Sequence, residues 1–239
     1  MDIKQAIPVQ TIWNRQTIFS LPINEQAESL VSVSYLPEKI IVSPQYFIQG
    51  IAGALPEIFL RSGAFKHLVK AAHSLPTGYK LVVFDAWRSI ATQQALFDSY
   101  QQQLAKANPT WSASQLEVAT LRIVALPSTL ATKPSPHNTG GSIDLSIVDP
   151  QGRLLEMASP FDDTSNYAKT SYFEENQPTS PSEVTARNNR RWLYQIMLAA
   201  GFTNYPEEWW HYDFGNQNWA YQSQQNQAIY GATQPNFPW

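Results

Sequence analysis

Helical spacing of apolar residues defines the first clear element of the chain. Between residues 56 and 75, apolar side chains recur at intervals of about three and four residues, and Pro76 follows as a stop. The recurring positions are Ile58, Leu60, Phe65, Leu68, Val69 and Ala72. The pattern predicts a helix over residues 56–75, because a proline at position 56 is tolerated in the first turn.

Three later segments also have helical patterns. Residues 92–106 are polar and rich in Gln, with an apolar stripe along one side. Ser112 and Gln115 have capping-box spacing and predict the start of a helix over residues 113–124. Residues 187–200 carry apolar side chains at helical spacing, and Gly201 closes the segment.

Strand patterns lie between these helices. Residues 79–84 form a short, almost continuous apolar run, as expected for a buried strand. Residues 143–148 alternate, and the turn sequence Asp-Pro-Gln-Gly follows, which predicts a hairpin between residues 142–148 and 153–157. Residues 209–214 form a short aromatic strand.

The remaining segments have weaker patterns. Residues 32–35 and 39–42 are short strands or extended loops, and residues 127–136 form a loop that leads to His137. Residues 159–183 are polar and rich in Pro and Ser, which predicts a long functional loop or a lid. No internal repeat and no break in composition divides the chain.

Composition narrows the class of protein. The 239 residues are 43% hydrophobic and 15% charged, which is typical of a globular chain, and the net charge of -3 does not favour nucleic acid as the main partner. The chain has no cysteine, so any metal must be held by His, Asp or Glu. No signal peptide or membrane-spanning run is evident, so we expect a cytoplasmic protein without a membrane partner.

Two of the four histidines lie in patterns that suit a metal. His137 and Asp144 are separated by a pair of glycines that allows the chain to fold back, and His211 would complete a set of three ligands. Three protein ligands leave a position for water, which is typical of a catalytic zinc. Glu208 would then be the general base, although Glu207 has almost the same spacing.

Other interpretations of these residues exist. Each residue alone would more often be a hydrogen-bonded loop histidine, a turn residue or a surface acid, and only their combination favours a metal site. In a regular strand, positions 208 and 211 would point to opposite faces. The prediction therefore requires Glu208 to lie in a loop before the strand, which Pro206 favours.

Three motifs carry a resemblance to a known family. They are Ser-x-His-x-x-Gly-x-x-x-Asp over residues 135–144, Glu-x-Trp-His over residues 208–211, and Asp-x-x-Arg over residues 85–88. With these motifs, roughly residues 79–212 resemble the D-alanyl-D-alanine dipeptidases, which include the vancomycin-resistance dipeptidases and are related to zinc D,D-carboxypeptidases and hedgehog domains. Trp87, Ser89 and Pro136 depart from the usual family pattern, which bears on the shape of the substrate pocket.

The resemblance implies a fold and a zinc site. The expected fold is α+β: a single domain in which a small antiparallel sheet carries the zinc site and helices pack around it. Residues 1–50 would be an N-terminal extension packed on a catalytic domain of residues 51–239. One zinc ion per chain would be held by the ligands His137, Asp144 and His211.

The resemblance also implies roles for individual residues. Glu208, rather than Glu207, would be the catalytic base, and Arg88 would stabilise the oxyanion, although an Arg88–Asp85 salt bridge is the structural alternative. Asp162 would bind the free ammonium group of a dipeptide, Ser135 would lie near its carboxylate, and Tyr35 would reach the pocket.

Three functions follow from these expectations. The first is hydrolysis of D-Ala-D-Ala or a related D,D-dipeptide. The second is a D,D-carboxypeptidase or endopeptidase acting on longer peptidoglycan peptides. The third is a catalytically silent zinc-binding module, which would need neither Glu208 nor Arg88.

Overall fold

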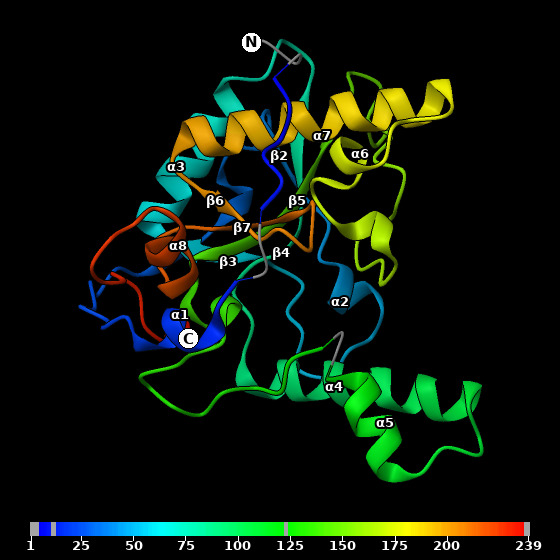
Figure 1. Cartoon of the computed structure of the whole chain (residues 1–239). Helices are drawn as coiled ribbons and strands as arrows, with labels where there is room; N and C mark the ends of the chain where they lie inside the picture. Colours follow the sequence, from blue (N-terminus) through cyan, green and yellow to red (C-terminus); the bar gives the residue numbers. More distant parts are fainter. Residues whose placement is uncertain (1–4, 11–12, 122–123, 237–239) are drawn as a thin grey trace.

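The computed structural model describes residues 5–10, 13–121 and 124–236, and its architecture is α+β (Figure 1). A five-stranded sheet has the order β2-β4-β5-β7-β6, and a two-stranded sheet pairs β1 with β3. All strand pairs are antiparallel except β2 with β4, which is parallel and therefore departs from the predicted antiparallel sheet. The strands are β1 (Leu30–Ser32), β2 (Ile40–Val42), β3 (Phe59–Arg61), β4 (Lys80–Asp85), β5 (Ser142–Val148), β6 (Thr203–Asn204) and β7 (His211–Asp213).

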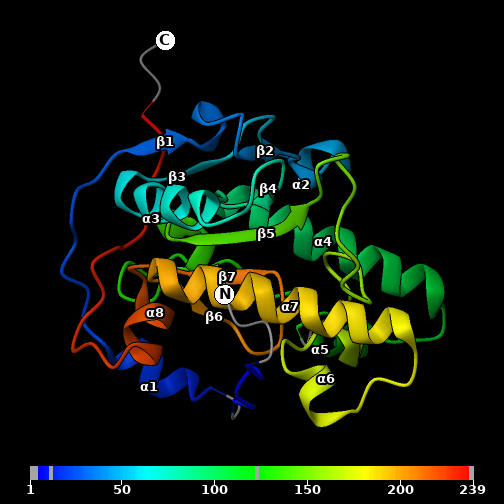
Figure 2. The same cartoon turned by 90° about the horizontal axis from the view of Figure 1, so that it is seen from above.

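The longer helices lie on both sides of the large sheet. Figures 1 and 2 show α3 (Ser62–His73) and α7 (Pro181–Ala200) over one face, whereas α4 (Ile90–Ala107) and α5 (Ala113–Thr120) lie beyond the other. The shorter helices are α1 (Arg15–Ser20), α2 (Gln45–Ile48), α6 (Tyr172–Glu175), α8 (Gln217–Gln222), η1 (Val33–Tyr35), η2 (Pro136–Thr139) and η3 (Asn166–Ala168). None of the described helices is long and apolar enough to cross a membrane.

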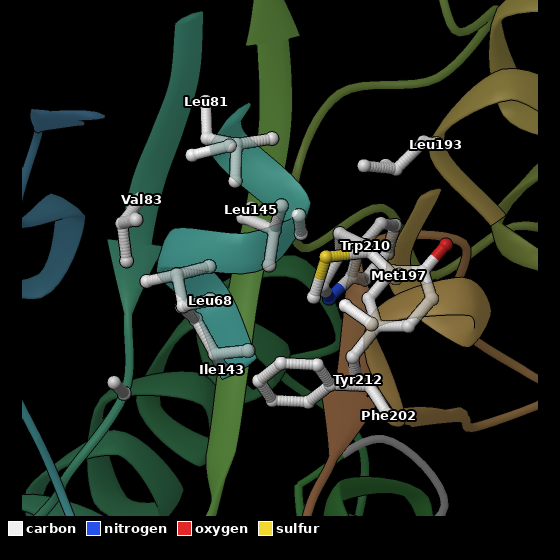
Figure 3. Close-up of a cluster of buried hydrophobic side chains, with 14 of the residues drawn as sticks. Leu68, Leu81, Val83, Ile143, Leu145, Leu193, Met197, Phe202, Trp210 and Tyr212 are labelled. Atoms are coloured by element: carbon white, nitrogen blue, oxygen red, sulfur yellow. The ribbon is translucent and has the colours of Figure 1, made fainter. Parts of the chain in front are cut away.

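The main core fills the space between the sheet and the α3–α7 layer (Figure 3). Successive strand residues point to opposite faces, so every second side chain of β4 and β5 enters this core. Trp210, just before β7, and Tyr212 of β7 also belong to this core. Its buried members include Leu68, Leu81, Val83, Ile143, Leu145, Ile147, Leu193, Met197 and Phe202.

The predicted helix over residues 56–75 was wrong in its first part. β3 occupies its start and pairs with β1, and α3 begins only at Ser62. The buried Arg61 guanidinium donates hydrogen bonds to the carbonyl oxygens of Thr139 (2.9 Å) and Glu28 (2.7 Å). These partners are 78 and 33 residues away, and such long-range bonds fix an extended backbone where local spacing indicated a helix.

Most other predicted elements agree with the structure. The strand over residues 79–84, the helix over residues 92–106 and the Ser112–Gln115 capping box are confirmed by β4, α4 and α5. α5 ends at Thr120, and residues 122 and 123 of its predicted end lie outside the described residues. The second arm of the predicted hairpin is reduced to a single bridge between Val148 and Leu154.

The polar segment of residues 159–183 is anchored to the domain. α7 starts at Pro181, six residues before the predicted start, because Ser180 and Glu183 form a capping box that the prediction missed. The segment also contains η3 and α6. The buried Arg190 guanidinium of α7 donates hydrogen bonds to the carbonyl oxygens of Met157 (2.8 Å) and Tyr167 (2.6 Å). These bonds attach the backbone just before the segment, and the backbone within its first half, to α7.

The first 50 residues contribute strands to both sheets. β1 pairs with β3, and β2 forms the edge of the large sheet beside β4. The division of the chain at residue 50 stays a prediction.

Candidate metal centre and active site

Two paired strands bring the first two candidate ligands together. Asp144 of β5 lies directly opposite His211 of β7 in the antiparallel register. Their neighbours Ile143 and Tyr212 enter the main core, so Asp144 and His211 point to the opposite face of the sheet. The alternation of side chains along β5 and β7, which points the apolar residues into the core, therefore also brings Asp144 and His211 together on the other face.

The third ligand comes from the short helix η2. His137 lies in its first turn, and Gly140 ends the helix in the left-handed conformation (φ 70°), which a glycine adopts without strain. A Cβ atom at Gly141 would collide with the carbonyl oxygen of Phe214. The two glycines thus allow the tight return from η2 to β5 that the sequence predicted.

Three ligand atoms converge at this point. Among the described residues, the ligand atoms of His137, Asp144 and His211 all lie within 4.8 Å of one another. His211 Nδ1 is 3.0 Å from Asp144 Oδ1 and 3.2 Å from His137 Nε2, and His137 Nε2 is 3.5 Å from Asp144 Oδ2. Tetrahedral zinc with ligands at its usual bond lengths would place ligand atoms about 3.3 Å apart, so the spacing fits the ion.

Hydrogen bonds orient both imidazoles toward this point. His137 Nδ1 lies 2.6 Å from the carbonyl oxygen of Ala86, which leaves Nε2 to face the other ligands. His211 Nε2 lies 3.2 Å from Asp213 Oδ1, which leaves Nδ1 to face them. With protons on the outward nitrogens, two imidazole lone pairs and a carboxylate face one another, and a cation would relieve their mutual repulsion.

Asp213 was missed by the sequence analysis. Its buried Oδ1 accepts hydrogen bonds from Ser142 Oγ and Asn216 Nδ2, both at 2.6 Å. Burial opposes the charge of Asp213 and that of His211, but the attraction between the two side chains outweighs this effect. The pKa of Asp213 is therefore below its usual range, and the pKa of His211 is above its usual range. The available signal was its position two residues after His211, on the same face of β7.

Glu208 lies in the bent segment that the prediction required. The backbone N–H of Glu208 donates to Tyr205 O (3.1 Å), and that of His211 donates to Glu208 O (3.2 Å), so the chain turns twice before β7. Glu208 Oε2 thereby lies 3.7 Å from His211 Nδ1, with one third of the side chain accessible. Burial raises the pKa of Glu208 to about 7 against the lowering effect of His211, and a carboxyl group of this pKa can accept and release protons near neutral pH.

Glu207 points elsewhere. Its carboxylate lies 4.0 Å from Lys169 Nζ, and its side chain is 44% exposed. The structure therefore brings Glu208, and not Glu207, to the three candidate ligands.

Arg88 lies beside the candidate ligands at the end of β4. Its guanidinium donates to Asp85 Oδ2 (3.0 and 2.8 Å) and to Gln93 Oε1 (2.8 Å), and its Nη2 lies 4.0 Å from Asp144 Oδ2. Burial opposes its charge, but the Asp85 carboxylate keeps the pKa of Arg88 above its usual range. The salt bridge with Asp85, which was the structural alternative to an oxyanion-stabilising role, is present, and it holds a permanent cation next to the candidate ligands.

The two aspartates here are unusually easy to protonate. Burial raises the pKa of Asp85 and that of Asp144 to about 6, although Arg88 and His211, respectively, oppose the rise. Carboxyl groups with raised pKa values are common at functional sites, and a cation bound close to them would stabilise their charged form.

The three predicted substrate-binding residues differ from one another in their hydrogen bonds. Asp162 is accessible, and its Oδ1 accepts a hydrogen bond from Tyr46 Oη at 3.1 Å. Ser135 precedes η2, and its hydroxyl accepts a hydrogen bond from Ser128 N at 3.2 Å. Tyr35 is 78% exposed, and within the described part of the chain its side chain does not contact the candidate ligands.

Comparisons with known proteins show which family of sequences this chain resembles. The D-Ala-D-Ala dipeptidase family profile matches residues 58–230. The D-alanyl-D-alanine dipeptidase of Synechocystis sp. is 29% identical over 222 residues, which cover 86% of this chain and 90% of the relative. The enzyme of the same name from Escherichia coli is 29% identical over 121 residues, which cover 51% and 54%.

One solved structure shares a more distant similarity. A mutant of the vancomycin-resistance D,D-pentapeptidase VanY, in complex with Zn(II), is 19% identical with a TM-score of 0.41, over 72% of this chain and 83% of that chain. The family profile covers most of the chain, and its match contains all three candidate ligands, Glu208 and Arg88. This chain therefore belongs to the D-Ala-D-Ala dipeptidase family of peptidases.

Proposed function

We propose that the protein is a zinc-dependent dipeptidase that hydrolyses D-Ala-D-Ala or a related D,D-dipeptide. The observation that carries the proposal is the convergence of His137, Asp144 and His211, with the Glu208 carboxylate 3.7 Å from one of these ligands. Membership of the family and the name shared by the relatives support the choice of substrate. One zinc ion per chain would be held by His137 Nε2, Asp144 and His211 Nδ1.

The chain's own residues would carry the proton transfers and stabilise charge. Zinc in this site would supply a Lewis acid that polarises the scissile carbonyl and acidifies water. Glu208 accepts a proton from the attacking water and delivers it to the leaving nitrogen as the C–O bond forms and the C–N bond breaks. The guanidinium of Arg88, fixed by Asp85 and Gln93, faces the negative charge that develops on the carbonyl oxygen.

Two further residues would recognise the ends of the dipeptide. The accessible Asp162 carboxylate suits a free ammonium group, and Ser135 offers a hydroxyl near the substrate carboxylate. Tyr35 stays a predicted pocket residue, and its exposed side chain would contact the substrate only at the surface of the site.

The proposed role of Asp162 in binding the ammonium group distinguishes a dipeptidase from a D,D-carboxypeptidase or endopeptidase. A carboxypeptidase or endopeptidase acting on longer peptides would have no use for Asp162, since its substrates lack a free amine at that position. A silent zinc-binding module would need neither the recessed Glu208 nor Arg88.

Alanine release from D-Ala-D-Ala and from its N-acetylated form tests the proposal. We expect the zinc-loaded protein to cleave only the free dipeptide. Glu208→Ala should keep its zinc and lose about 10²–10⁴-fold in kcat, because it removes the general base. Glu207→Ala is the matched control and should retain activity within about twofold.

Three outcomes would contradict the proposal. Normal turnover by Glu208→Ala would overturn the mechanism. Cleavage of the N-acetylated form would identify a carboxypeptidase. Zinc binding without cleavage of either compound would favour the silent module.

A further inference from the structure

Tyr46 lies beside the candidate site although it belongs to none of the three sequence motifs. Parallel strands end at the same edge of a sheet, so the residues after β2 and those after β4 meet. Ser43 N donates to Val83 O (2.8 Å) just beyond β2, and α2 follows at once (Figure 2). Tyr46 of α2, which is 6% exposed, therefore lies against the end of β4 and outside the part of the chain that the family profile matches.

Two contacts connect this tyrosine to the proposed machinery. The Arg88 guanidinium carbon lies 4.8 Å from the centroid of the Tyr46 ring, a cation–π distance. The Tyr46 hydroxyl donates a hydrogen bond to Asp162 Oδ1 at 3.1 Å. One buried side chain thus touches both the proposed oxyanion-stabilising group and the proposed ammonium-binding group.

The conformation of Asp162 depends on contacts with its neighbours. Its backbone is left-handed (φ 61°), which costs energy in a residue with a side chain, and its side chain is exposed. The preceding Phe161 packs its ring against three other rings, with centroid distances of 5.8 Å to Tyr46, 5.1 Å to Phe84 and 5.7 Å to Trp210. Phe161 fixes the backbone, and the Tyr46 hydroxyl donates a hydrogen bond to the Asp162 carboxylate.

We propose that Tyr46 is a specificity-determining positioning residue that selects substrates with a free amino group next to the scissile bond. This inference rests on the proposed function. In a dipeptide, the ammonium group and the scissile carbonyl belong to the same residue. Because Tyr46 contacts Asp162 through its hydroxyl and Arg88 through its ring, it holds the two recognition groups at a fixed spacing from each other.

Removal of the Tyr46 hydroxyl alone tests the hydrogen bond to Asp162. Tyr46→Phe keeps the ring over Arg88 and against Phe161 but leaves the Asp162 carboxylate without its donor. We expect KM for free D-Ala-D-Ala to rise about tenfold with kcat within about twofold, since a hydrogen bond to a charged group is lost. Tyr46→Leu also removes the ring, so its kcat should fall too, and Tyr46→Phe should restore that kcat.

Tyr79→Phe provides the matched control. Tyr79 lies at the opposite end of β4, about 20 Å along the strand from Asp85, and packs its ring against Trp192. Loss of its hydroxyl should leave KM, kcat and substrate preference unchanged.

A binding measurement separates this inference from the proposed function. Calorimetric titration of the zinc-loaded Glu208→Ala protein, with and without Tyr46→Phe, should show about tenfold weaker binding of free D-Ala-D-Ala and unchanged binding of N-acetyl-D-Ala-D-Ala. Equal weakening of both ligands, or of neither, would overturn the role of Tyr46. Failure of the wild-type protein to cleave D-Ala-D-Ala would overturn the proposed function, whereas the titration would still decide whether Tyr46 discriminates the free amine.

Discussion

The two faces of strand β5 are equally buried but chemically opposite. All seven residues of the strand are buried. Ile143, Leu145 and Ile147 enter the main core beneath α3 and α7, whereas Asp144 and Ser146 face the side that carries the candidate metal site. Burial alone therefore does not separate residues that hold the fold from residues that serve the site.

The difference lies in what each face gains from burial. Apolar side chains gain free energy when they leave water, about 25 cal/mol for each Å². A desolvated carboxylate loses hydration and is stabilised only by a cation or by hydrogen bonds. Stability and metal binding should therefore respond separately to substitutions one residue apart on this strand.

The largest expected effect is that of Asp144→Asn. The amide keeps the volume of the side chain but removes a charged ligand, so we expect zinc binding to weaken and activity to fall roughly 10³-fold. The metal-free variant should unfold cooperatively like the wild type. Zinc content and urea unfolding of the metal-free protein measure both results, and retained zinc with full activity would contradict the proposed ligand set.

Leu145→Ala should produce the opposite pattern. Leu145 is fully buried, and its truncation leaves a cavity in the core, so we expect a loss of about 2–5 kcal/mol in the free energy of unfolding. Zinc affinity of the folded protein should stay within about threefold, because Leu145 points away from the ligands. A large change in zinc affinity would show that the two faces are coupled.

Asp213→Asn sharpens the comparison within the polar face. Asp213 binds no metal in the proposal but orients His211, so we expect zinc affinity to fall about 10–100-fold, measured by competition with a chelator. Asp149→Asn is the control, because the Asp149 carboxylate pairs with Arg153 in the turn after β5. Unchanged affinity in Asp213→Asn would show that strand pairing alone orients His211.

Ser146→Ala should have the smallest effect. The Ser146 hydroxyl is buried without a hydrogen-bond partner among the described residues, so its removal should be neutral or stabilise the fold by up to about 1 kcal/mol. Urea unfolding measures the change, with Leu145→Ala as the destabilised reference. A clear loss of stability would indicate that a bound water or ligand uses this hydroxyl.

Local sequence determined much of the fold. Apolar periodicity and capping residues are short-range signals, and they located β4, α4 and the start of α5. The glycine pair before β5 and the motifs around His137 and His211 also indicated which residues would meet, since the chemistry of a metal site restricts the residue types.

Long-range pairing decided the rest. β3 replaced the start of a predicted helix because its backbone bonds with β1 and Arg61 reaches distant carbonyl groups. The local pattern indicated an extended segment at residues 39–42, but the parallel pairing of β2 with β4, and with it the place of Tyr46, has no short-range signal. The sequence by itself determined the candidate ligands and most of the main elements. Only the tertiary structure decided that Asp213 and Tyr46 join the site, because their partners are chosen by the register and direction of the strands.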